Sequence, residues 1–557
     1  MATDYQKLEL PYVRSPDQDA REPVHHPVIV VGAGPVGLTA AIDLAKYGVP
    51  VVVLDEDNRL SHGSRAICFA KRTLEIWDRL GCGERMVQKG VSWNVGKVYF
   101  RDEPVYTFNL LPEPGYHRPA FINLQQYYCE GFLYEHARTL PDLDLRWKNR
   151  VIGIDAQRDG VLLNVETPQG TYRLHADYVV ACDGARSPIR TMIGEQTKGR
   201  SFRDRFLIAD VKMQAAFPPE RWFWFDPPFH RNQSVLLHRQ PDDVWRIDFQ
   251  LGADADPEEE KRPERVIPRI KALLGEDVRF EIEWVSVYTF SCARMEKFRH
   301  RRILFAGDAA HCVSPFGARG ANSGVQDSDN LAWKLRLVLS AKAPDALLDS
   351  YDEERRFAAD ENIQCSTRAT DFITPKNRVS RTFRDATLKL SKDYAFARRL
   401  VNSGRLSLPA ILRESPLNTP DQDSFADTMA PGTPAADAPV NVGGNAGWFL
   451  TQIGGTFNGV YFSDGTLAAS TRDALAALAK QAMPISTVVV VPKGISLSDA
   501  RAGPAIAVDS EGLVHQRFDA RPGTFYLIRP DQHVCARWRR LDVDATRRAL
   551  ARATCNG

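Results

Sequence analysis

The sequence predicts an α/β protein in which a Rossmann-like domain is interleaved with a β-rich domain and followed by a small α/β domain. Three observations predict this class. A strand-length apolar run, Val28–Val31, meets a glycine cluster and then a helical rhythm over Pro35–Tyr47, which indicates a β-α-β unit and a parallel sheet. Similar α/β sequence returns after an aromatic, strand-rich stretch at 206–287. A Pro-, Asp- and Ala-rich segment, 417–440, precedes a last compact α/β pattern.

These patterns divide the chain of 557 residues into several segments, as expected for a length that exceeds one compact core. The segments are an N-terminal extension (1–26), a discontinuous Rossmann-like domain (27–205 and 288–395), a β-sheet domain that covers the substrate (206–287), a helical segment and linker (396–440) and the C-terminal domain (441–557). In the first part we expect helices at 72–80 and 126–140 and a β-meander over 151–174.

Composition excludes several classes of function. The net charge is 72 − 70 = +2, so no field draws the chain to nucleic acid or to an anionic membrane. No apolar run approaches the ~20 residues that cross a bilayer. The N-terminus lacks the pattern of a secretory signal, and nine cysteines occur without CxxC or zinc spacing. We therefore expect a cytoplasmic protein with free thiols and no bound metal.

The first motif with chemistry lies between the first strand and the first helix. Gly32 permits a tight turn, Gly34 lets the backbone approach a pyrophosphate, and Gly37 allows close packing of helix on sheet. The phosphate then lies at the positive end of the helix. Asp55 closes the second strand, where an acceptor for ribose hydroxyls is needed. A glycine turn beside a solvated aspartate would look the same, but strand, helix and acid together favour a dinucleotide site.

A second motif distinguishes FAD from NAD. A buried strand runs into Gly307 and Asp308, and the segment 315–322 then leads into a helix near Gly320. Asp308 can accept a hydrogen bond from a ribityl or ribose hydroxyl. The helix directs its N-terminus at the electron-rich side of an isoalloxazine ring, which stabilises the reduced anion. A tight turn before a capped helix is the alternative. Between the two motifs, Asp183 and a glycine end another buried strand.

The three motifs resemble those of the class A flavoprotein aromatic hydroxylases, the para-hydroxybenzoate hydroxylase superfamily. The matching residues are GAGPVG at Gly32–Gly37, DGARSPIR at Asp183–Arg190 and GDAAH at Gly307–His311, and the resemblance covers 27–395. The C-terminal part resembles the thioredoxin-like domain of the phenol hydroxylase and 3-(3-hydroxyphenyl)propionate hydroxylase branches, with Tyr526–Trp538 matching its closing strands. That domain has no CxxC here, so packing or dimer support is expected rather than redox chemistry.

The resemblance also implies roles for individual residues around FAD, to which Gly32, Gly34, Gly37, Gly307 and Gly320 add backbone contacts. Many relatives have Glu where this chain has Asp55, and the shorter aspartate side chain should still reach the ribose hydroxyls. The implied positions are Asp55 at the adenosine ribose, Arg65 in the mobile-flavin loop, Gln126 against the FAD, Asp183 at FAD and NAD(P)H, Asp308 at the ribityl chain, Pro315 with its carbonyl beside flavin and substrate, and Asn322 near the pyrimidine end of the flavin.

The reaction that the resemblance implies uses non-covalent FAD, NADH or NADPH, and O2. Reduced flavin and O2 give a C4a-hydroperoxide, whose distal oxygen is attacked by a small phenolic ring. A base or a hydrogen-bond relay should deprotonate the phenol. Besides Pro315, the candidate catalytic residues are His230 and Tyr288, although a lone His or Tyr is more often structural. A homodimer is expected from the resemblance alone.

Alternative functions stay open at this point. One is another flavin oxygenase outcome, such as Baeyer–Villiger insertion or oxygenation of a polyketide ring. A flavin halogenase is suggested only by Trp222–Pro227, which half-resembles a WxWxIP motif but has Asp226 in place of isoleucine. A non-catalytic flavin-binding regulatory protein is the alternative from a different class, and the complete set of cofactor motifs weighs against it.

Overall fold

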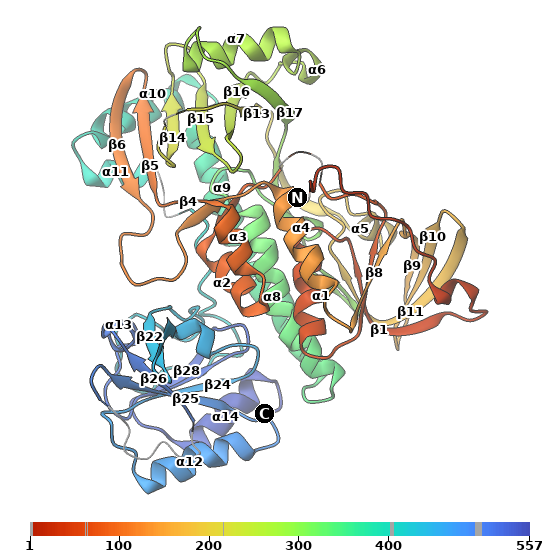
Figure 1. Ribbon diagram of the computed structural model, residues 1–557, viewed down its shortest axis with the longest axis vertical. Coiled ribbons are helices and arrows are strands. Elements are labelled where there is room, and N and C mark those ends of the chain that lie inside the picture. The colour runs from red at the N-terminus through yellow and green to blue at the C-terminus, as the bar shows by residue number, and fades with distance from the viewer. Residues whose placement is uncertain (1–3, 62, 64, 216, 402–405, 496–503) are drawn as a thin grey trace.

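The computed structural model describes residues 4–61, 63, 65–215, 217–401, 406–495 and 504–557. Figure 1 shows three parts: an antiparallel-rich sheet at the top, a helix-covered sheet in the centre and right, and the C-terminal domain at the lower left. The long helix α8 (Gly320–Leu339) runs through the centre and connects the top of the molecule with the C-terminal domain. The α/β class, with several mixed sheets and an additional C-terminal sheet, is therefore confirmed.

The central sheet is a parallel sheet extended by antiparallel strands. β1 pairs in parallel with β2 and β11, β2 with β8, and β11 with β20, while β9 and β10 continue from β11 as the expected meander. The strands are β19 (Arg299–His300), β20 (Ile303–Phe305), β11 (Gly170–Ala181), β1 (Val24–Val31), β2 (Val51–Asp55), β8 (Leu143–Trp147), β9 (Arg150–Ala156) and β10 (Val161–Thr167).

Helices cover this sheet because their apolar faces need burial. Val28–Val31 and Val51–Leu54 are buried strands, and α1 packs on them and against α8. The parallel sheet explains the continuous apolar runs seen in the sequence, since both of its faces are covered. The helices are α1 (Pro35–Lys46), α2 (Lys71–Leu80), α3 (Gly83–Lys89), α4 (Gln126–Ala137), α5 (Pro188–Met192), α8 and α9 (Asp349–Ile373).

The upper sheet forms the β-rich domain, and the set of strands that it contains differs from the prediction in one respect. Besides the expected strands from 205–288, it contains the hairpin β5–β6, whose strand β5 pairs in parallel with β14. The sequence prediction had left 95–109 in the Rossmann-like domain. In order of pairing, the strands are β17 (Glu281–Tyr288), β13 (Arg205–Lys212), β16 (Val244–Leu251), β15 (Ser234–Arg239), β14 (Arg221–Phe225), β5 (Val95–Phe100) and β6 (Glu103–Asn109).

The two faces of the upper sheet have different neighbours. One face, with Trp224, Leu237 and Phe249, packs on α7 (Pro263–Leu274), which follows the short helix α6 (Pro257–Glu260). The other face, with Phe225 and Leu236, packs toward the central domain. The helices α10 (Arg378–Ser391) and α11 (Ala395–Val401) follow α9. Two small sheets lie between the domains. They are β12 (Thr197–Ser201) with β18 (Ser291–Met295) and β21 (His311–Cys312), and β3 (Cys68–Ala70) with β7 (Phe121–Asn123) and β4 (Val91–Trp93).

The C-terminal domain has the βαβ and ββα halves of a thioredoxin-like sheet. β24 and β25 pair in parallel around α12, and β27 and β28 add antiparallel strands before the terminal helix α14. Its elements are β22 (Pro439–Val442), β23 (Asn445–Trp448), β24 (Asn458–Phe462), α12 (Ala469–Lys480), β25 (Ser486–Pro492), β26 (Ala505–Asp509), α13 (Leu513–Arg517), β27 (Phe525–Ile528), β28 (Val534–Trp538) and α14 (Val543–Ala553).

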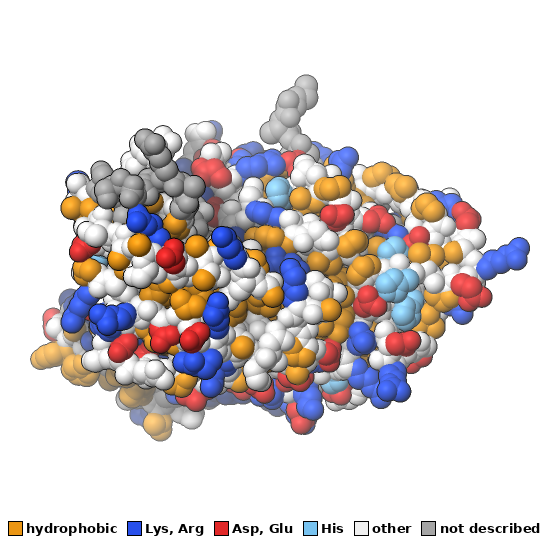
Figure 2. Space-filling model, turned by 90° about the horizontal axis from the view of Figure 1, so that it is seen from below, with side chains coloured by type: hydrophobic (Ala, Val, Ile, Leu, Met, Phe, Trp, Pro, Cys, Tyr) orange, Lys and Arg blue, Asp and Glu red, His pale blue; other side chains and the backbone are white. Residues whose placement is uncertain are grey.

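The surface seen from below carries Lys and Arg interspersed with Asp and Glu (Figure 2), in agreement with a net charge of +2. Among the coloured, described residues in this view, no contiguous field of a single sign covers the face. The described part of the chain contains no helix that combines the length and the apolar character needed to cross a membrane.

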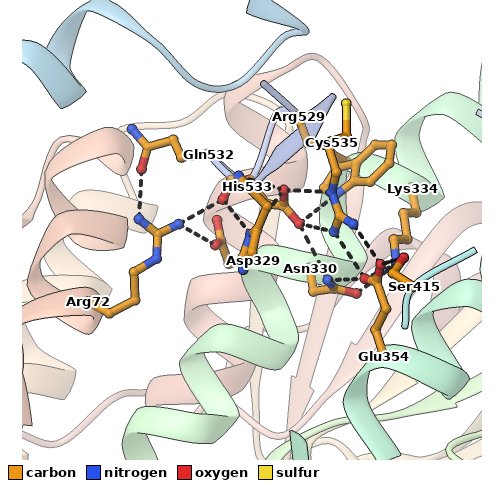
Figure 3. A network of polar contacts seen from close by, with 12 residues as sticks. Arg72, Asp329, Asn330, Lys334, Glu354, Ser415, Arg529, Gln532, His533 and Cys535 are labelled. Carbon is orange, nitrogen blue, oxygen red and sulfur yellow. Dashed lines mark hydrogen bonds and ion pairs between the residues drawn. The ribbon is translucent and has the colours of Figure 1, made fainter. Parts of the chain in front are cut away.

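A buried network of charges joins the C-terminal domain to the central domain (Figure 3). Arg529, just after β27, donates to Glu354 of α9 at 2.6 and 3.0 Å and to Asp531 at 2.5 Å. Lys334 of α8 donates to the same Glu354 at 2.8 Å. The side chains of these residues are at most 1% exposed. Arg72 of α2 also contacts the segment that follows β27, because it donates to the Asp531 backbone carbonyl at 2.8 Å.

We expect Arg529→Met to destabilise the protein strongly, because it leaves two carboxylates buried without this cation. The free energy of unfolding should fall by about 3–5 kcal/mol. Denaturant unfolding followed by tryptophan fluorescence measures it. Arg413 pairs with Asp427 on the surface, with side chains 50% and 80% exposed, and its replacement by Met should cost about 1 kcal/mol or less. Equal losses for the two variants would contradict the role of the buried network.

Candidate functional site

The glycine-rich turn between β1 and α1 has one glycine that faces open space. A Cβ on Gly32, which has φ +103°, would lie 2.4 Å from the Cys182 carbonyl oxygen, and a Cβ on Gly37 would lie 1.9 Å from the Gly32 oxygen. A Cβ on Gly34 would meet no atom within 4 Å. The outer two glycines are therefore needed for packing, whereas Gly34 leaves a space at the helix N-terminus that suits a diphosphate.

Asp55 closes this turn from the end of β2. Its carboxylate accepts hydrogen bonds from the backbone N–H groups of Ala33 at 2.6 Å and Asp57 at 2.9 Å. Burial raises the pKa of Asp55 to about 6. The acid is thus held beside the Gly-rich turn, where the sequence analysis expected the ribose.

The loop that carries Arg65 is fixed to α4 by two side chains of that helix. Gln126 accepts from the Ala66 N–H at 3.0 Å and donates to the Ser61 hydroxyl at 2.8 Å. Glu130, one turn further along α4, accepts from the Ser61 N–H at 2.7 Å. The sequence analysis missed Glu130, although its i+4 spacing from Gln126 could have indicated that both point toward this loop. Positions 62 and 64 of the loop lie outside the described residues.

Asp183 stands just after the end of β11 with one oxygen in use. It accepts from the Ile189 N–H at 3.0 Å, whereas its Oδ1 is buried and has no hydrogen-bond partner among the described residues. Burial raises the pKa of this carboxyl. A buried acceptor without a partner is rare in native proteins and indicates an absent donor, such as a ligand hydroxyl.

The turn at Gly307 is held from behind by a buried acid. Asp327 of α8 accepts from the Gly307 N–H at 2.9 Å, from His311 at 2.7 Å and from Arg355 at 2.6 Å. The Asp308 side chain takes no part in these bonds and is exposed to solvent, although surrounding protein raises the pKa of its carboxyl. We call the solvent space beside Asp308 and Gly320 the recess. The sequence analysis did not find Asp327, since its partners come from distant segments.

The segment from Pro315 to Asn322 leads from this turn into α8. The Pro315 carbonyl accepts from the Ala318 N–H at 3.1 Å, and a Cβ on Gly320 would lie 3.9 Å from Asp308 Oδ1. Asn322 is buried and donates to the carbonyls of Cys68 and Ala318 at 2.9 and 2.6 Å. Asn322 thus fixes the start of α8, while Asp308 and Gly320 face the same space.

A cavity with aromatic walls lies on the other side of that segment. Phe316 and Gly317 line it from the turn, Phe223 and Phe225 from β14, and Phe108 from β6. Two arginines also line it: Arg221, which is 8% exposed, and Arg319, which donates to Asn362 at 2.8 Å. One turn of the chain therefore separates this cavity from the recess of Asp308 and Gly320.

Tyr288 and His230, the two other predicted catalytic residues, lie in different places. Tyr288, at the end of β17, is half-buried beside Arg65 and Arg246, whose charges limit the rise that burial causes in its pKa. His230 contacts Phe249 edge to face and bonds to the Gln250 carbonyl at 2.6 Å. Phe249 belongs to the face that packs on α7, so His230 lies away from the cavity, on the other side of the sheet.

The halogenase-like tryptophans also point away from the cavity. Trp222 and Trp224 alternate with the cavity-lining side chains of β14 and pack on the α7 side of the sheet. Among the described residues, no group of His, Cys, Asp and Glu side chains is placed to hold a metal ion.

Comparison with known proteins identifies the class. Residues 25–366 match the family model described as an FAD binding domain, so the chain belongs to this family. The 3-(3-hydroxy-phenyl)propionate/3-hydroxycinnamic acid hydroxylase of Mycolicibacterium smegmatis is 30% identical over 65% of this chain and 64% of that protein. The probable NADH-specific resorcinol 4-hydroxylase of Rhodococcus jostii is 34% identical over 59% and 62%, respectively. These matches span slightly less than two thirds of the relatives' length.

A solved structure extends the likeness to the whole fold. The flavin-dependent monooxygenase PieE, crystallised in complex with FAD and substrate, has a TM-score of 0.80 and covers 96% of this chain and 100% of its own, at 21% identity. This match includes the C-terminal domain. The resemblance to class A flavoprotein hydroxylases and the fold class expected from it are confirmed.

The glycines of the first turn give a matched pair of variants. Gly34→Val places its side chain in open space, so the FAD-free protein should keep its melting temperature but fail to retain flavin. Gly37→Val would drive atoms into the Gly32 backbone and should cost about 1–3 kcal/mol or more of stability. Flavin content and thermal unfolding measure both effects. Normal flavin content in Gly34→Val would contradict the proposed diphosphate position.

Asp55 gives a pH prediction. Ribose hydroxyls bond best to the ionised carboxylate, so FAD binding should lower the pKa of Asp55 from its value of about 6. Affinity should consequently weaken as the pH falls through 6. Asp55→Asn should bind FAD about ten- to a hundredfold more weakly at pH 8 and show a smaller pH dependence. Fluorescence titration with FAD measures this, and identical pH profiles for the two proteins would contradict it.

Proposed function

We propose that this protein is an FAD-dependent, NAD(P)H-consuming monooxygenase that hydroxylates a small phenolic aromatic substrate. The observation that carries the proposal is the shared turn at 315–320. Its Phe316 and Gly317 line an aromatic cavity, and its Gly320 faces the recess that contains Asp308. A ring in the cavity would thus lie next to the flavin end of a dinucleotide whose diphosphate occupies the space at Gly34.

The residues present fit FAD. Gly34 and the N-terminus of α1 would hold the diphosphate, Asp55 the adenosine ribose, and Asp183 and Asp308 hydroxyls of the cofactor. The N-terminus of α8 at Gly320 would stabilise negative charge on a flavin ring bound beside it. The chemistry that bound FAD would supply is acceptance of hydride from NAD(P)H and activation of O2 for transfer to the substrate.

The protein's own contribution is orientation and exclusion of water. Phe108, Phe223, Phe225 and Phe316 give an aromatic ring a low-polarity cavity with few positions in which it packs well. The relatives named above act on phenols, which supports a phenolic substrate for this chain. A homodimer stays a prediction from the resemblance.

Substituted phenols and hydroxyphenyl carboxylates test the function. We expect at least one of them to accelerate NADH or NADPH oxidation by the FAD-loaded protein and to gain one oxygen atom, as measured by mass spectrometry. Phe223→Ala should weaken binding of that substrate by removing ring contacts worth about 0.5–1.5 kcal/mol. Leu237→Ala, on the face toward α7, is the control for general loss of core packing. Flavin-loaded protein that oxygenates none of these rings would contradict the proposal.

A further inference from the structure

One wall of the aromatic cavity comes from the edge of the upper sheet. Phe108 belongs to β6, which lies last in the pairing order and, among the described strands, pairs only with β5. Its ring lies over Gly96 of β5, since a Cβ on Gly96 would be 2.1 Å from Phe108 Cζ. An edge strand has a partner on one side alone, so the position of this ring also depends on what holds the segment after β6.

The segment after β6 connects the cavity with a small apolar cluster. Leu110 is buried in this cluster, and Phe108, which lines the cavity, packs against it. Asn94 joins the two ends of the segment, because its backbone carbonyl accepts from the Leu110 N–H and its side chain accepts from the Ala120 N–H, both at 2.8 Å. The residues between them, 111–119, form a loop that starts and ends beside the cavity wall.

The tip of this loop is held by α13 of the C-terminal domain, and Figure 1 shows the loop descending from β6 to that helix. Arg517 donates to the backbone carbonyls of Pro114 and Gly115, the latter at 2.8 Å. It also donates to the carbonyl of Asp437, shortly before β22. Its guanidinium lies over the ring of Tyr116, 4.0 Å from the ring centre. One side chain thus joins the loop to the C-terminal domain.

Close packing on both sides of Tyr116 accompanies these hydrogen bonds. Gly115 has φ +74°, and a Cβ on it would lie 2.2 Å from Leu513 Cδ1 of α13. His117 stacks on Trp448, with ring centres 4.9 Å apart and an angle of 19° between the planes. No described residue of the C-terminal domain lines the cavity itself. The domain therefore contacts the cavity wall only through the segment that continues β6.

We propose that Arg517 is a positioning residue for the substrate cavity. By holding the tip of loop 111–119 on α13, it keeps Leu110 and the edge strand β6 in place, so that Phe108 forms the wall on which the substrate ring packs. The C-terminal domain thereby contributes to substrate affinity. This inference deepens the proposed function and rests on it, since the ring that contacts Phe108 is that of the phenolic substrate.

Steady-state kinetics with the substrate found by screening test the role of Arg517. Arg517→Met removes its hydrogen bonds to the loop and should raise KM about two- to tenfold, the range of a weakened ring contact, with kcat changed less than about twofold. Arg517→Lys should keep part of the affinity, because an ammonium group can still donate to these carbonyls.

Arg539→Met is the matched control for Arg517→Met. Arg539 also donates to backbone carbonyls, those of Ser424 and Asp519, and it also lies over an aromatic ring, that of Phe425. These partners belong to the linker and the C-terminal domain, so their loss should leave KM unchanged. Flavin content and thermal unfolding show that each variant is folded and loaded with FAD.

A double-mutant cycle tests whether Arg517 acts through Phe108. Phe108→Ala should itself raise KM, because it removes a wall of the cavity. In the Phe108→Ala background, Arg517→Met should have little further effect, since the side chain that it positions is gone. Two independent contributions to affinity would instead multiply.

Hydrogen exchange in the FAD-loaded protein tests the same connection without any substrate. Arg517→Met should accelerate amide exchange in loop 111–119 and in β6, because both lose the contact that holds the tip of the loop. Arg539→Met should leave exchange in both segments unchanged.

The outcomes separate this inference from the function on which it rests. An unchanged KM in Arg517→Met, an equal rise in Arg539→Met, or effects that multiply in the double variant would overturn the role of Arg517. Unchanged exchange in β6 would overturn it as well. A protein that oxygenates no ring contradicts the proposed function instead, and the exchange experiment then still decides whether the C-terminal domain holds the cavity wall.

Discussion

Backbone packed against backbone at the start of α1 is the constraint on which the site depends. A Cβ on Gly37 would lie 1.9 Å from the Gly32 oxygen, and one on Gly324 of α8 would lie 2.6 Å from Val36 and 3.1 Å from the Gly307 Cα. Neither Gly37 nor Gly324 therefore leaves room for a side chain of its own. Ser328 adds a hydrogen bond from α8 to the Val36 carbonyl at 2.8 Å. The two cofactor turns, far apart in the sequence, are thereby held against each other.

The helix α8 contacts both the cofactor turns and the C-terminal domain. Its first turn faces the recess of Asp308, its middle carries Asp327 behind the Gly307 turn, and its last part contributes Lys334 to the buried charge network. The C-terminal domain thus contacts the same helix whose N-terminus would stabilise the flavin. Arg529 ties that domain to α9, and the sequence has no CxxC motif, so packing or dimer support stays the expectation for its role.

The sequence predicted what depends on local pattern. Gly32, Gly34 and Gly37 could be assigned separate roles because a strand, a turn and a helix follow one another, and Asp55 follows from the end of the next strand. The hairpin β5–β6 escaped prediction because its place in the upper sheet comes from pairing with β14, more than a hundred residues away. His230 was predicted to be catalytic because aromatic residues lie near it in the sequence. Those neighbours do not determine on which face of the upper sheet a loop side chain packs.

The central claim is that the two turns and the adjoining cavity hold one FAD and one aromatic ring side by side. A crystal structure of the protein with FAD and a bound phenol tests it most directly. The account predicts the diphosphate above Gly34 at the N-terminus of α1, the isoalloxazine between Asp308 and Gly320, and the phenol within the cavity lined by Phe223 and Phe316. A flavin bound elsewhere, or a recess at Gly34 that stays empty at saturating FAD, would contradict it.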